Sequence, residues 1–406
     1  MYRPSLKEPG VPALSTTITD EQTGLKGWVV VDSLLGGRAI GGTRMTPGVN
    51  DKELATLART MTCKLALAGL PIGGAKAGIA SNLPRGEARS RQLAAFGRLA
   101  APLVHGGIYI GSDQGVGYED RELIHRAAGY EVTAQGKPLP FSWSELWDRC
   151  EDVTGHGVCQ STSVIADHLM LPPEMRTVVI QGFGLVGRGV ARGLSAWGYK
   201  IIGVADAQGT VYSHDGLPVE ALLAATDSAG TIDRKRLPDW IQTSSEPDMW
   251  LSLRCGLLVL AAVGNAVHEK NVERVNARAV IEGANNPCSH EAILALHRRG
   301  VAVMPDIVAN SGGATVSALF LLGLTPPLAL GSLVTWCFEE VARRVKSNSA
   351  LFVRGYLQEG KPIHELAHAV AHERLEVLRS ALQTGMSPTE AAALLEVSTM
   401  SAPQVH

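Results

Sequence analysis

One glycine-rich turn constrains the fold of this 406-residue chain more than any other feature. The apolar run TVVIQ at 177–181 leads directly into the turn, helix-forming residues follow as far as Gly198, and a second apolar run, IIGVAD, ends at Asp206. This order of strand, turn, helix and strand predicts a parallel sheet covered by helices, that is, a doubly wound α/β domain of the Rossmann type. The residues of the turn are Gly182, Phe183, Gly184, Leu185, Val186 and Gly187.

The spacing of the glycines indicates a dinucleotide site. Gly182 allows a tight turn, Gly184 lets the backbone approach a pyrophosphate, and Gly187 lets the helix pack closely on the strand. The pyrophosphate would lie at the amino end of the helix, where free N–H groups attract an anion. Asp206, about 20 residues further on, is placed to accept from the ribose hydroxyls. No Lys or Arg lies between Asp206 and Ser213, which favours NAD and leaves NADP as the alternative. The other interpretation is a glycine turn that binds no nucleotide.

The composition excludes several classes of protein. Hydrophobic residues make up 45% of the chain, and 37 basic residues nearly balance 39 acidic ones. Disordered chains combine low hydrophobicity with high net charge, and nucleic-acid binders need a basic surplus. The six cysteines are scattered and form no CxxC pair, no signal peptide is recognised, and no apolar run is long enough for a membrane span. We therefore expect a cytoplasmic protein without a nucleic-acid or membrane partner.

The chain before residue 150 differs in character from the part that follows. Strand-like runs at 27–33 and 38–44 are joined by a Gly36-Gly37 turn, and a helical pattern extends from Asp51 to Gly69. After residue 155, strand-like runs alternate with helices, and the chain is helical beyond about residue 330. We expect a first domain over 1–150 and the Rossmann-type domain over 151–344, with helices from about 345–406 packing back on the first domain.

Two lysines and an aspartate of the first domain suggest a catalytic site. Lys76 lies between glycines in the stretch PIGGAKAGIA, which we expect to be a loop, and Asp113 lies in GSDQG. A lysine in such a confined place can lose solvent, which lowers its pKa and makes it a usable base. Lys64, twelve residues earlier on the predicted helix, would lower that pKa further or hold a carboxylate. Taken alone, Lys76 could equally be a surface lysine on a glycine-rich loop.

Motifs over about 25–330 make a resemblance to a known family recognisable. The chain resembles the glutamate/leucine/phenylalanine/valine dehydrogenase family. That resemblance implies an NAD(P)-dependent enzyme acting on the CH–NH2 group, which converts an L-amino acid reversibly to a 2-oxo acid and ammonium. It also implies a homo-oligomer whose first domain binds substrate and mediates oligomerisation. The matching motifs are GGTRM, MTCKLALAGLPIGGAKAGI, YIGSDQGVG, VTGHGV, VVIQGFGLVG, AAVGNAV, EGANNP and PDIVANSGGATVS.

The resemblance implies a role for each matching residue of the first domain. Lys64 would bind the α-carboxylate of the substrate. Lys76 would activate the water that attacks the iminium carbon, and Asp113 would exchange protons with the amino group. Gly41 and Gly42 would form the backbone floor of the substrate pocket.

The same resemblance assigns residues outside the first domain. Thr154 opens the cofactor domain, and Asn265 and Asn310 match asparagines near the nicotinamide and ribose. Ser317 matches a serine at the side-chain end of the substrate pocket in glutamate-specific members.

One position departs from the glutamate-specific pattern. Those members carry a lysine immediately before GG-x-R, where it holds the substrate γ-carboxylate, but this chain has Ile40 there. An apolar side chain leaves a carboxylate desolvated and unpaired, at a cost of several kcal/mol. Ile40 resembles the leucine, valine and phenylalanine branch, whereas Ser317 resembles the glutamate branch. We therefore predict an uncharged amino acid as substrate, with glutamate as the alternative. The segment 137–153 lacks the expected Gly-Gly after GKP and carries extra residues.

Two further interpretations remain. His364-Glu365-Leu366-Ala367-His368 spells HExxH, a spacing that can bind zinc, but the segment is helical and remote from the predicted site, so we expect no metal. A catalytically silent relative that senses nucleotide or amino acid is an alternative from another class. The presence of Lys64, Lys76 and Asp113 together disfavours it.

Overall fold

The computed structural model describes residues 11–134 and 137–400, and the chain forms two compact units. The sequence prediction placed 151–344 in the second domain and about 345–406 with the first. In the structure, 314–330 belong to the first unit and 331–368 to the second. Of the described residues, unit 1 comprises 11–134, 137–147, Ala314–Leu330 and 369–400; unit 2 comprises Asp148–Gly313 and Gly331–His368.

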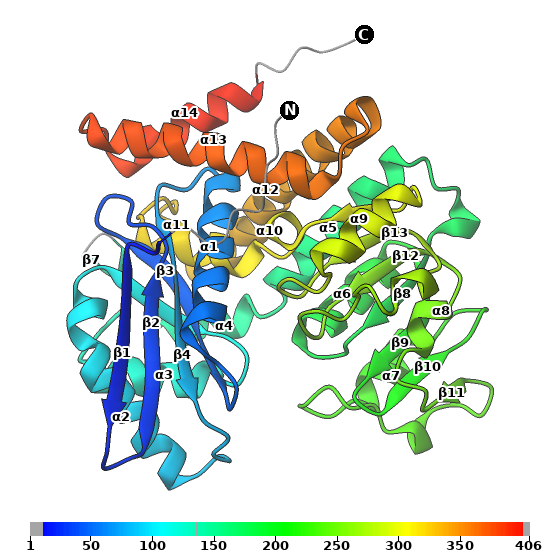
Figure 1. Cartoon of the computed structure of the whole chain (residues 1–406), viewed down its shortest axis with the longest axis horizontal. Helices are drawn as coiled ribbons and strands as arrows, with labels where there is room; N and C mark the ends of the chain where they lie inside the picture. Colours follow the sequence, from blue (N-terminus) through cyan, green and yellow to red (C-terminus); the bar gives the residue numbers. More distant parts are fainter. Residues whose placement is uncertain (1–10, 135–136, 401–406) are drawn as a thin grey trace. The chain divides into compact units, whose positions relative to one another are not determined.

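Unit 1 is built on a five-stranded sheet with the order β1-β2-β4-β3-β5, drawn in blue and cyan in Figure 1. β3 pairs in parallel with both β4 and β5, whereas β2 pairs antiparallel with β1 and β4. Parallel pairing brings the carboxyl ends of β3, β4 and β5 to the same edge of the sheet. The strands are β1 (Leu14–Asp20), β2 (Leu25–Val31), β3 (Ala39–Thr46), β4 (Gly73–Ala80) and β5 (Ile108–Ser112), and a separate pair is formed by β6 (Thr133–Ala134) and β7 (Lys137–Pro138).

Helices cover both faces of this sheet. On β2, Trp28 and Val30 pack with residues of α1, while Val29 and Val31 belong to the cluster that contains residues of α2. The alternation follows from the two-residue period of a strand. Lys76 is therefore positioned in the middle of a sheet that is covered on both sides. The helices are α1 (Asp51–Leu67), α2 (Glu87–His105) and α3 (Tyr118–Ala128).

The stretch around Lys76 is a strand, so the prediction of a loop was wrong. Its glycines are required because neighbouring backbone packs closely against this strand, and not because the chain turns here. A Cβ at Gly73 would lie 1.7 Å from the carbonyl oxygen of Ser33, and a Cβ at Gly74 would lie 2.3 Å from the amide nitrogen of Thr62 on α1. The Gly36-Gly37 turn does exist, but β4 lies between β2 and β3, so these strands are not neighbours.

Part of the segment 137–153, which carries extra residues, forms helix α4 (Trp143–Arg149). Its two tryptophans are buried against aromatic residues of unit 1. Trp143 Nε1 donates to Tyr109 Oη at 2.9 Å, and the Trp143 ring makes an edge contact with Phe320. Trp147 packs on Trp143 and stacks on Tyr118. The extra residues therefore add aromatic groups to unit 1.

The carboxyl-terminal helices of unit 1 lie side by side in Figure 1, and Leu378 and Ala381 of α13 cluster with Ala391 and Leu395 of α14. A capping box stands at Ser387, because Ser387 Oγ accepts from the amide of Glu390 while the Glu390 carboxylate accepts from the amide of Ser387. The helices from residue 312 onward are α11 (Gly312–Leu321), α12 (Leu330–Glu359), α13 (Ile363–Gln383) and α14 (Pro388–Met400).

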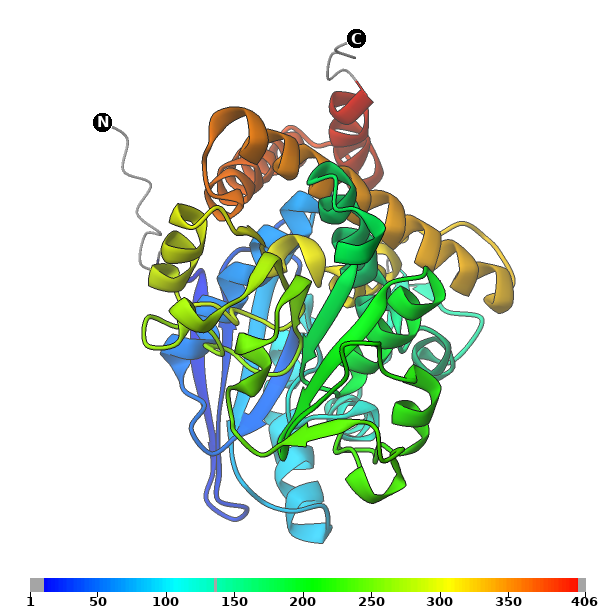
Figure 2. The same ribbon diagram turned by 90° about the vertical axis from the view of Figure 1, so that its right-hand side faces the viewer.

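Unit 2 is a seven-stranded sheet with the order β11-β10-β9-β8-β12-β13-β14, seen in green and yellow-green in Figure 2. Five strands are parallel, as predicted from the alternation of apolar runs and helices, and β10 and β11 add antiparallel pairs at one edge. The strands are β8 (Thr177–Gln181), β9 (Lys200–Asp206), β10 (Gly209–Tyr212), β11 (Gln242–Ser244), β12 (Cys255–Leu260), β13 (Ala277–Glu282) and β14 (Ala302–Met304).

Both faces of this sheet are buried, as its continuous apolar strands require. Val179, Leu258 and Val280 join a cluster with residues of α8 and α9, and their neighbours in sequence are buried on the opposite face, where α5 and α6 pack. The helices of unit 2 before α11 are α5 (Val153–His168), α6 (Leu185–Ala196), α7 (Val219–Ala224), α8 (Met249–Ser252), α9 (His290–Arg298) and α10 (Asp306–Ala309).

A buried histidine makes the stability of unit 1 depend on pH. His125 on α3 is 6% exposed and donates through Nε2 to the Ile110 carbonyl oxygen at 2.7 Å. Burial lowers its pKa from 6.5 to about 4, and Arg121 acts in the same direction. The folded form therefore resists protonation between pH 6.5 and 4, while the unfolded chain takes up the proton. This stabilisation is complete above pH 6.5 and is lost as the pH falls toward 4.

Replacing His125 with glutamine, which can donate but does not titrate, should remove this dependence. The quantity to compare is the free energy of unfolding, native chain minus His125→Gln. We expect this difference to decrease by roughly 2 kcal/mol when the pH is lowered from 7 to 5. Urea unfolding at several pH values measures it. A difference that stays constant over this range would contradict the assignment.

Candidate active site

The two predicted catalytic residues form an ion pair in unit 1. Lys76 Nζ lies 2.9 Å from Asp113 Oδ2, and the Lys76 side chain is only 5% exposed. Lys76 is in β4, and Asp113 directly follows β5, two strands away across β3. The sheet topology therefore brings together two residues that are 37 positions apart in the sequence.

Two residues that the sequence analysis did not assign complete the network. Arg44 Nε lies 3.0 Å from the same Asp113 oxygen, and Arg44 Nη1 lies 2.6 Å from Glu53 Oε1 on α1. Arg44 belongs to the GGTRM motif, and this motif was the only feature of the sequence that pointed to a role for Arg44. Glu53 gave none, because it lies in the first turn of a helix where acidic residues are common.

Asp113 is held in its ionised form. Burial opposes ionisation, but the ammonium of Lys76 and the guanidinium of Arg44 outweigh it and lower the pKa of Asp113 from 3.8 to about 2. A carboxylate that is charged near neutral pH can accept hydrogen bonds from an ammonium group. The arrangement therefore provides an anion between two cations, in a position shielded from most of the solvent.

The glycines that precede Arg44 have no room for side chains. A Cβ at Gly41 would lie 1.8 Å from the Ala75 carbonyl oxygen, and one at Gly42 would lie 2.9 Å from Asp113 Cβ. Gly42 therefore lies directly against Asp113, the aspartate that the sequence predicts to be catalytic. These contacts explain why the strand that carries Arg44 contains glycines.

Ile40 and Lys76 lie on the same face of the sheet. Ile40 is in register with Gly74 of β4, so these two residues lie on the same face of the sheet. Lys76 is two residues after Gly74 and lies on that face as well, because side chains alternate along a strand. This face is the one that α1 covers. Ile40 is 2% exposed, and Lys64, in the last turn of α1, is 4% exposed.

Ser317 lies on α11 in the part of that helix that belongs to unit 1. It is 6% exposed, and Phe320, one turn later, packs edge-on against Trp143 and Phe141. Tyr109, which accepts the hydrogen bond of Trp143, is the register partner of Ile40 on β5. Trp143 therefore joins Tyr109, the register partner of Ile40, to Phe320, which follows Ser317 on α11.

The glycine turn of unit 2 has the geometry that its sequence requires. Gly182 has a φ of 96°, which favours glycine, and its amide donates to the Ala205 carbonyl oxygen at 2.8 Å. Gly184 is the N-cap of α6, and a Cβ built on it meets no heavy atom within 4 Å. A Cβ at Gly187 would lie 1.9 Å from the Gly182 carbonyl oxygen. Leu185 and Val186 form the first residues of α6, whose amino end is open to an anion.

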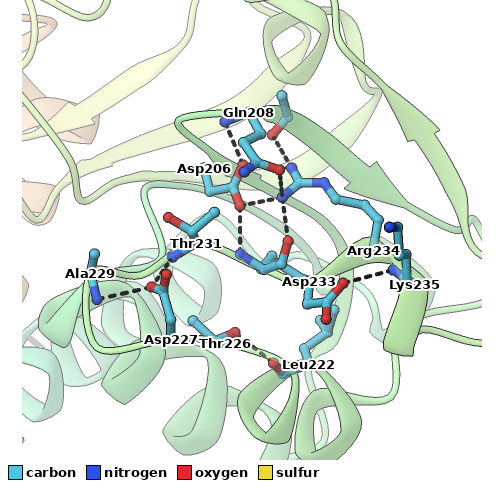
Figure 3. Close-up of polar contacts among 12 residues, drawn as sticks. Asp206, Gln208, Leu222, Thr226, Asp227, Ala229, Thr231, Asp233, Arg234 and Lys235 are labelled. Carbon is cyan, nitrogen blue, oxygen red and sulfur yellow. Dashed lines mark hydrogen bonds and ion pairs between the residues drawn. The ribbon is translucent and has the colours of Figure 1, made fainter.

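Asp206 ends β9 and is paired with a cation that the sequence analysis did not consider. Arg234, 28 residues later, points both terminal nitrogens at its carboxylate, each at 2.5 Å (Figure 3). Arg234 lies beyond the stretch from Asp206 to Ser213, which contains no basic side chain. The structure brings Arg234 to the same place from a short helical turn at Arg234–Arg236.

Two asparagines predicted near the nicotinamide lie at the carboxyl edge of the sheet of unit 2. Asn310 is 9% exposed and donates to the Gly283 carbonyl oxygen at 3.2 Å, but within the described residues its Oδ1 has no partner. Asn265 has a φ of 55° and donates through its amide to the Asn286 carbonyl oxygen. The third predicted residue, Thr154, is half-buried near the start of α5. An unpaired buried acceptor and an open glycine turn fit a dinucleotide with a carboxamide group.

The HExxH segment contains a largely buried histidine that contacts a buried glutamate. His364 Nε2 lies 3.1 Å from Glu282 Oε2 at the end of β13, and burial of both groups makes this an internal ion pair. Burial lowers the pKa of His364, but Glu282 outweighs that effect and raises it above 6.5. The pair anchors the first turn of α13 to the sheet of unit 2.

Comparison with known proteins identifies the family. The model described as Glu/Leu/Phe/Val dehydrogenase, dimerisation domain, matches residues 13–131, and the model described as Glutamate/Leucine/Phenylalanine/Valine dehydrogenase matches residues 148–385. Together, the fold and the site define the class of the protein: an α/β oxidoreductase with a separate nucleotide-binding unit. The chain belongs to the Glutamate/Leucine/Phenylalanine/Valine dehydrogenase family, as the sequence motifs predicted.

Individual relatives agree with this assignment. The glutamate dehydrogenase of Thermotoga maritima is 34% identical over 305 residues, which cover 72% of this chain and 71% of that protein. The NAD-specific glutamate dehydrogenase of Staphylococcus aureus strain COL is 31% identical and covers 68% and 67%. The crystal structure of hetero-hexameric glutamate dehydrogenase from Thermus thermophilus, in a Leu-bound form, has a TM-score of 0.74 and 27% identity, covering 92% of this chain and 90% of that one.

These findings confirm the predicted enzyme class. The chain is an amino acid dehydrogenase, an oxidoreductase that acts on the CH–NH2 group and uses NAD(P). The match of unit 1 to a dimerisation domain supports the predicted self-association. Throughout the described part of the chain, no helix is long and apolar enough to cross a membrane.

Proposed function

We propose that the chain catalyses the reversible oxidative deamination of an uncharged L-amino acid to the 2-oxo acid and ammonium. The contact between Lys76 and Asp113 is the main support for the proposed reaction. The position of Ile40 is the main support for an uncharged substrate. Bound NAD(P) supplies the acceptor for the hydride that leaves the substrate Cα.

The side chains of unit 1 account for the remaining proton transfers. Lys64, a buried ammonium, holds the substrate α-carboxylate. Asp113 takes a proton from the substrate ammonium, which frees the nitrogen lone pair to form the C=N bond as the hydride leaves. Lys76, as the neutral amine, then accepts a proton from the water that adds to the iminium carbon. Asp113 returns its proton to the nitrogen, which departs as ammonia, and the hydroxyl proton that is released as the C=O bond forms converts the ammonia to ammonium and leaves the 2-oxo acid.

The surroundings of Ile40 favour an uncharged side chain. Arg44 is the only cation on β3, and it is already bound to Asp113 and Glu53. The register partner of Ile40 on β5 is an aromatic residue, Tyr109. A substrate carboxylate placed here would be desolvated without a partner, at a cost of several kcal/mol. A leucine, valine or aromatic side chain would bury apolar surface instead.

Glutamate dehydrogenation is the second candidate. Ser317, which matches the serine of glutamate-specific members, supports it, and so do the names of the similar curated relatives. A serine hydroxyl can donate one hydrogen bond to a carboxylate but cannot neutralise its charge. We therefore place this candidate behind an uncharged substrate.

Initial rates with a panel of amino acids test the proposal. Absorbance at 340 nm would follow reduction of NAD and NADP, offered separately, with Glu, Leu, Val, Ile, Phe, Trp and Ala. We expect kcat/KM for one of the apolar amino acids to exceed that for Glu by at least about a hundredfold. Turnover with Glu alone would keep the enzyme class and overturn the argument from Ile40. Cofactor binding without turnover of any amino acid would favour the silent sensor.

We also propose that the enzyme works in the cytoplasm as a homo-oligomer. All six cysteines are buried free thiols, which suits a reducing compartment. The family match of unit 1 supports contact between copies of the chain.

A further inference from the structure

A buried arginine of unit 1 lacks hydrogen-bond acceptors for part of its guanidinium group. Arg121 on α3 is 2% exposed, and within the described residues its Nε and Nη2 atoms have no hydrogen-bond partner. Buried donors are normally hydrogen-bonded and buried charges are normally paired, because burial without a partner is costly in free energy. Unit 1 therefore contains a buried cation that the proposed chemistry at Lys76 and Asp113 does not use.

The carboxylates of α3 do not supply the missing acceptor. The side chain of Glu119 is 83% exposed, and Asp120 Oδ2 lies 2.6 Å from Arg89 Nη2. Glu122 Oε1 lies 3.8 Å from Arg121 Nη2, which is too far for a hydrogen bond, and the Glu122 side chain is 42% exposed. Adjacent residues of a helix point in different directions, so Glu122 is not placed to bind both nitrogens.

Aromatic side chains surround this guanidinium. Arg121 Cζ lies 5.2 Å from the centroid of the Tyr118 ring, and the Trp147 ring stacks on the same tyrosine at 6.2 Å. Trp147 is 8% exposed, and its Nε1 is a further buried donor with no partner in the part of the chain that the structure describes. Burial raises the pKa of Tyr109, and the neighbouring guanidinium of Arg121 opposes that rise. The region therefore combines a positive charge, unsatisfied N–H donors and apolar ring faces.

The two unpaired nitrogens of Arg121 form one edge of its guanidinium group. In this planar group an N–H bond of Nη2 runs parallel to the N–H bond of Nε, and such a pair matches the two oxygens of a carboxylate. A carboxylate bound at this edge would satisfy both nitrogens and balance the charge, while an apolar body would pack on the surrounding rings. The ammonium of an amino acid would instead add a second positive charge beside Arg121.

We propose that Arg121, Tyr118 and Trp147 form a second ligand site in unit 1, which binds a monocarboxylate anion with an apolar body. Simple carboxylic acids and 2-oxo acids with an apolar side chain share this chemistry. The site differs from the proposed substrate site in the cation that holds the carboxylate, which is Arg121 instead of Lys64. Occupation of one site therefore does not require the other, and the proposal does not rest on the proposed deamination.

Calorimetry with phenylacetate and phenylpyruvate, without cofactor, tests the site. The full-length Lys64→Met chain is used, because this change removes the cation of the proposed substrate site and keeps Arg121. We expect it to bind about one molecule of phenylacetate or phenylpyruvate per chain, and the tighter of the two identifies the kind of acid. L-Phenylalanine should bind at least about tenfold more weakly, because of its ammonium. Binding of neither acid, or equal affinity for L-phenylalanine, would overturn the proposal.

Substitution of Arg121 in the Lys64→Met chain tests the residue itself. Arg121→Met should abolish binding of the acid, and Arg121→Lys, which keeps the charge without the parallel N–H pair, should weaken it at least about tenfold. Circular dichroism verifies that each variant is folded, and Arg121→Lys remains informative where Arg121→Met does not fold.

Arg126→Met is the matched control, because Arg126 is an exposed arginine of the same helix. It should keep the affinity for the acid within about twofold. Unchanged binding in both Arg121 variants, or an equal loss in Arg126→Met, would overturn the assignment. These measurements involve no turnover, so failure of the proposed deamination would be visible separately, in the 340 nm assay.

Discussion

Lys76→Ala is expected to lower kcat by at least about a thousandfold while NAD(P) binding stays within about twofold. Lys76 is the only ammonium in contact with Asp113 within the described residues, and it lies in a covered sheet where water cannot replace it in a fixed position. A positioned acid or base contributes about a hundredfold to ten-thousandfold to a rate. The cofactor residues lie in unit 2, so the substitution leaves them unchanged. Rates at 340 nm and a fluorescence titration measure the two quantities.

The fold should tolerate this change, because Asp113 keeps Arg44 as a partner at 3.0 Å. Thermal unfolding and circular dichroism would verify that the variant is native. Lys52→Ala is a matched control, since Lys52 is an exposed lysine of unit 1 whose side chain has no partner among the described residues. The control should keep kcat within about twofold. Turnover of Lys76→Ala within tenfold of the native rate would remove Lys76 from the mechanism.

Combination with Asp113→Asn tests whether the two residues act as a unit. Groups that act together in one step show losses that do not add. The kcat of the double variant should therefore lie within about threefold of the kcat of the slower single variant. Losses that multiply would mean that Lys76 and Asp113 contribute independently.

The sequence predicted well those features that depend on local pattern. The turn at Gly182–Gly187 and its flanking strands could be placed because each glycine has a steric reason that the residues themselves reveal. The helix from Asp51 could be delimited because it begins after a side-chain cap, Asn50, and ends before Gly69, which has a φ of 70°. The family motifs indicated Lys76 and Asp113 as catalytic candidates, which the structure brings into contact.

The features that the sequence did not predict depend on distant packing. The glycines around Lys76 suggested a loop, yet they accommodate the close approach of α1 and of the chain after β2 to a strand. Arg234 could not be connected with Asp206, because 28 residues separate them and no local pattern sets their distance. Glu53 was missed for the same reason, since its partner Arg44 lies on a strand and not on its own helix.

Ile40→Lys is expected to reverse the preference for the substrate side chain. In the native chain Ile40 is buried on the face that carries Lys76, with no free cation on its strand. A lysine there would supply the missing charge for a γ-carboxylate, and kcat/KM for Glu should rise at least about tenfold. An apolar amino acid would instead leave that ammonium buried and unpaired, so its kcat/KM should fall at least about a hundredfold.

Ile40→Met separates charge from shape, because methionine has a similar unbranched stem without the ammonium. It should reduce kcat/KM for apolar amino acids by less than about tenfold and give no gain with Glu. If Ile40→Lys and Ile40→Met behave alike with Glu, the side chain at position 40 does not face the substrate. The substrate would then be selected by Ser317 and the aromatic residues around it. If they differ as expected, the charge at one position of β3 separates glutamate from uncharged amino acids, while Lys76 and Asp113 perform the same chemistry on both.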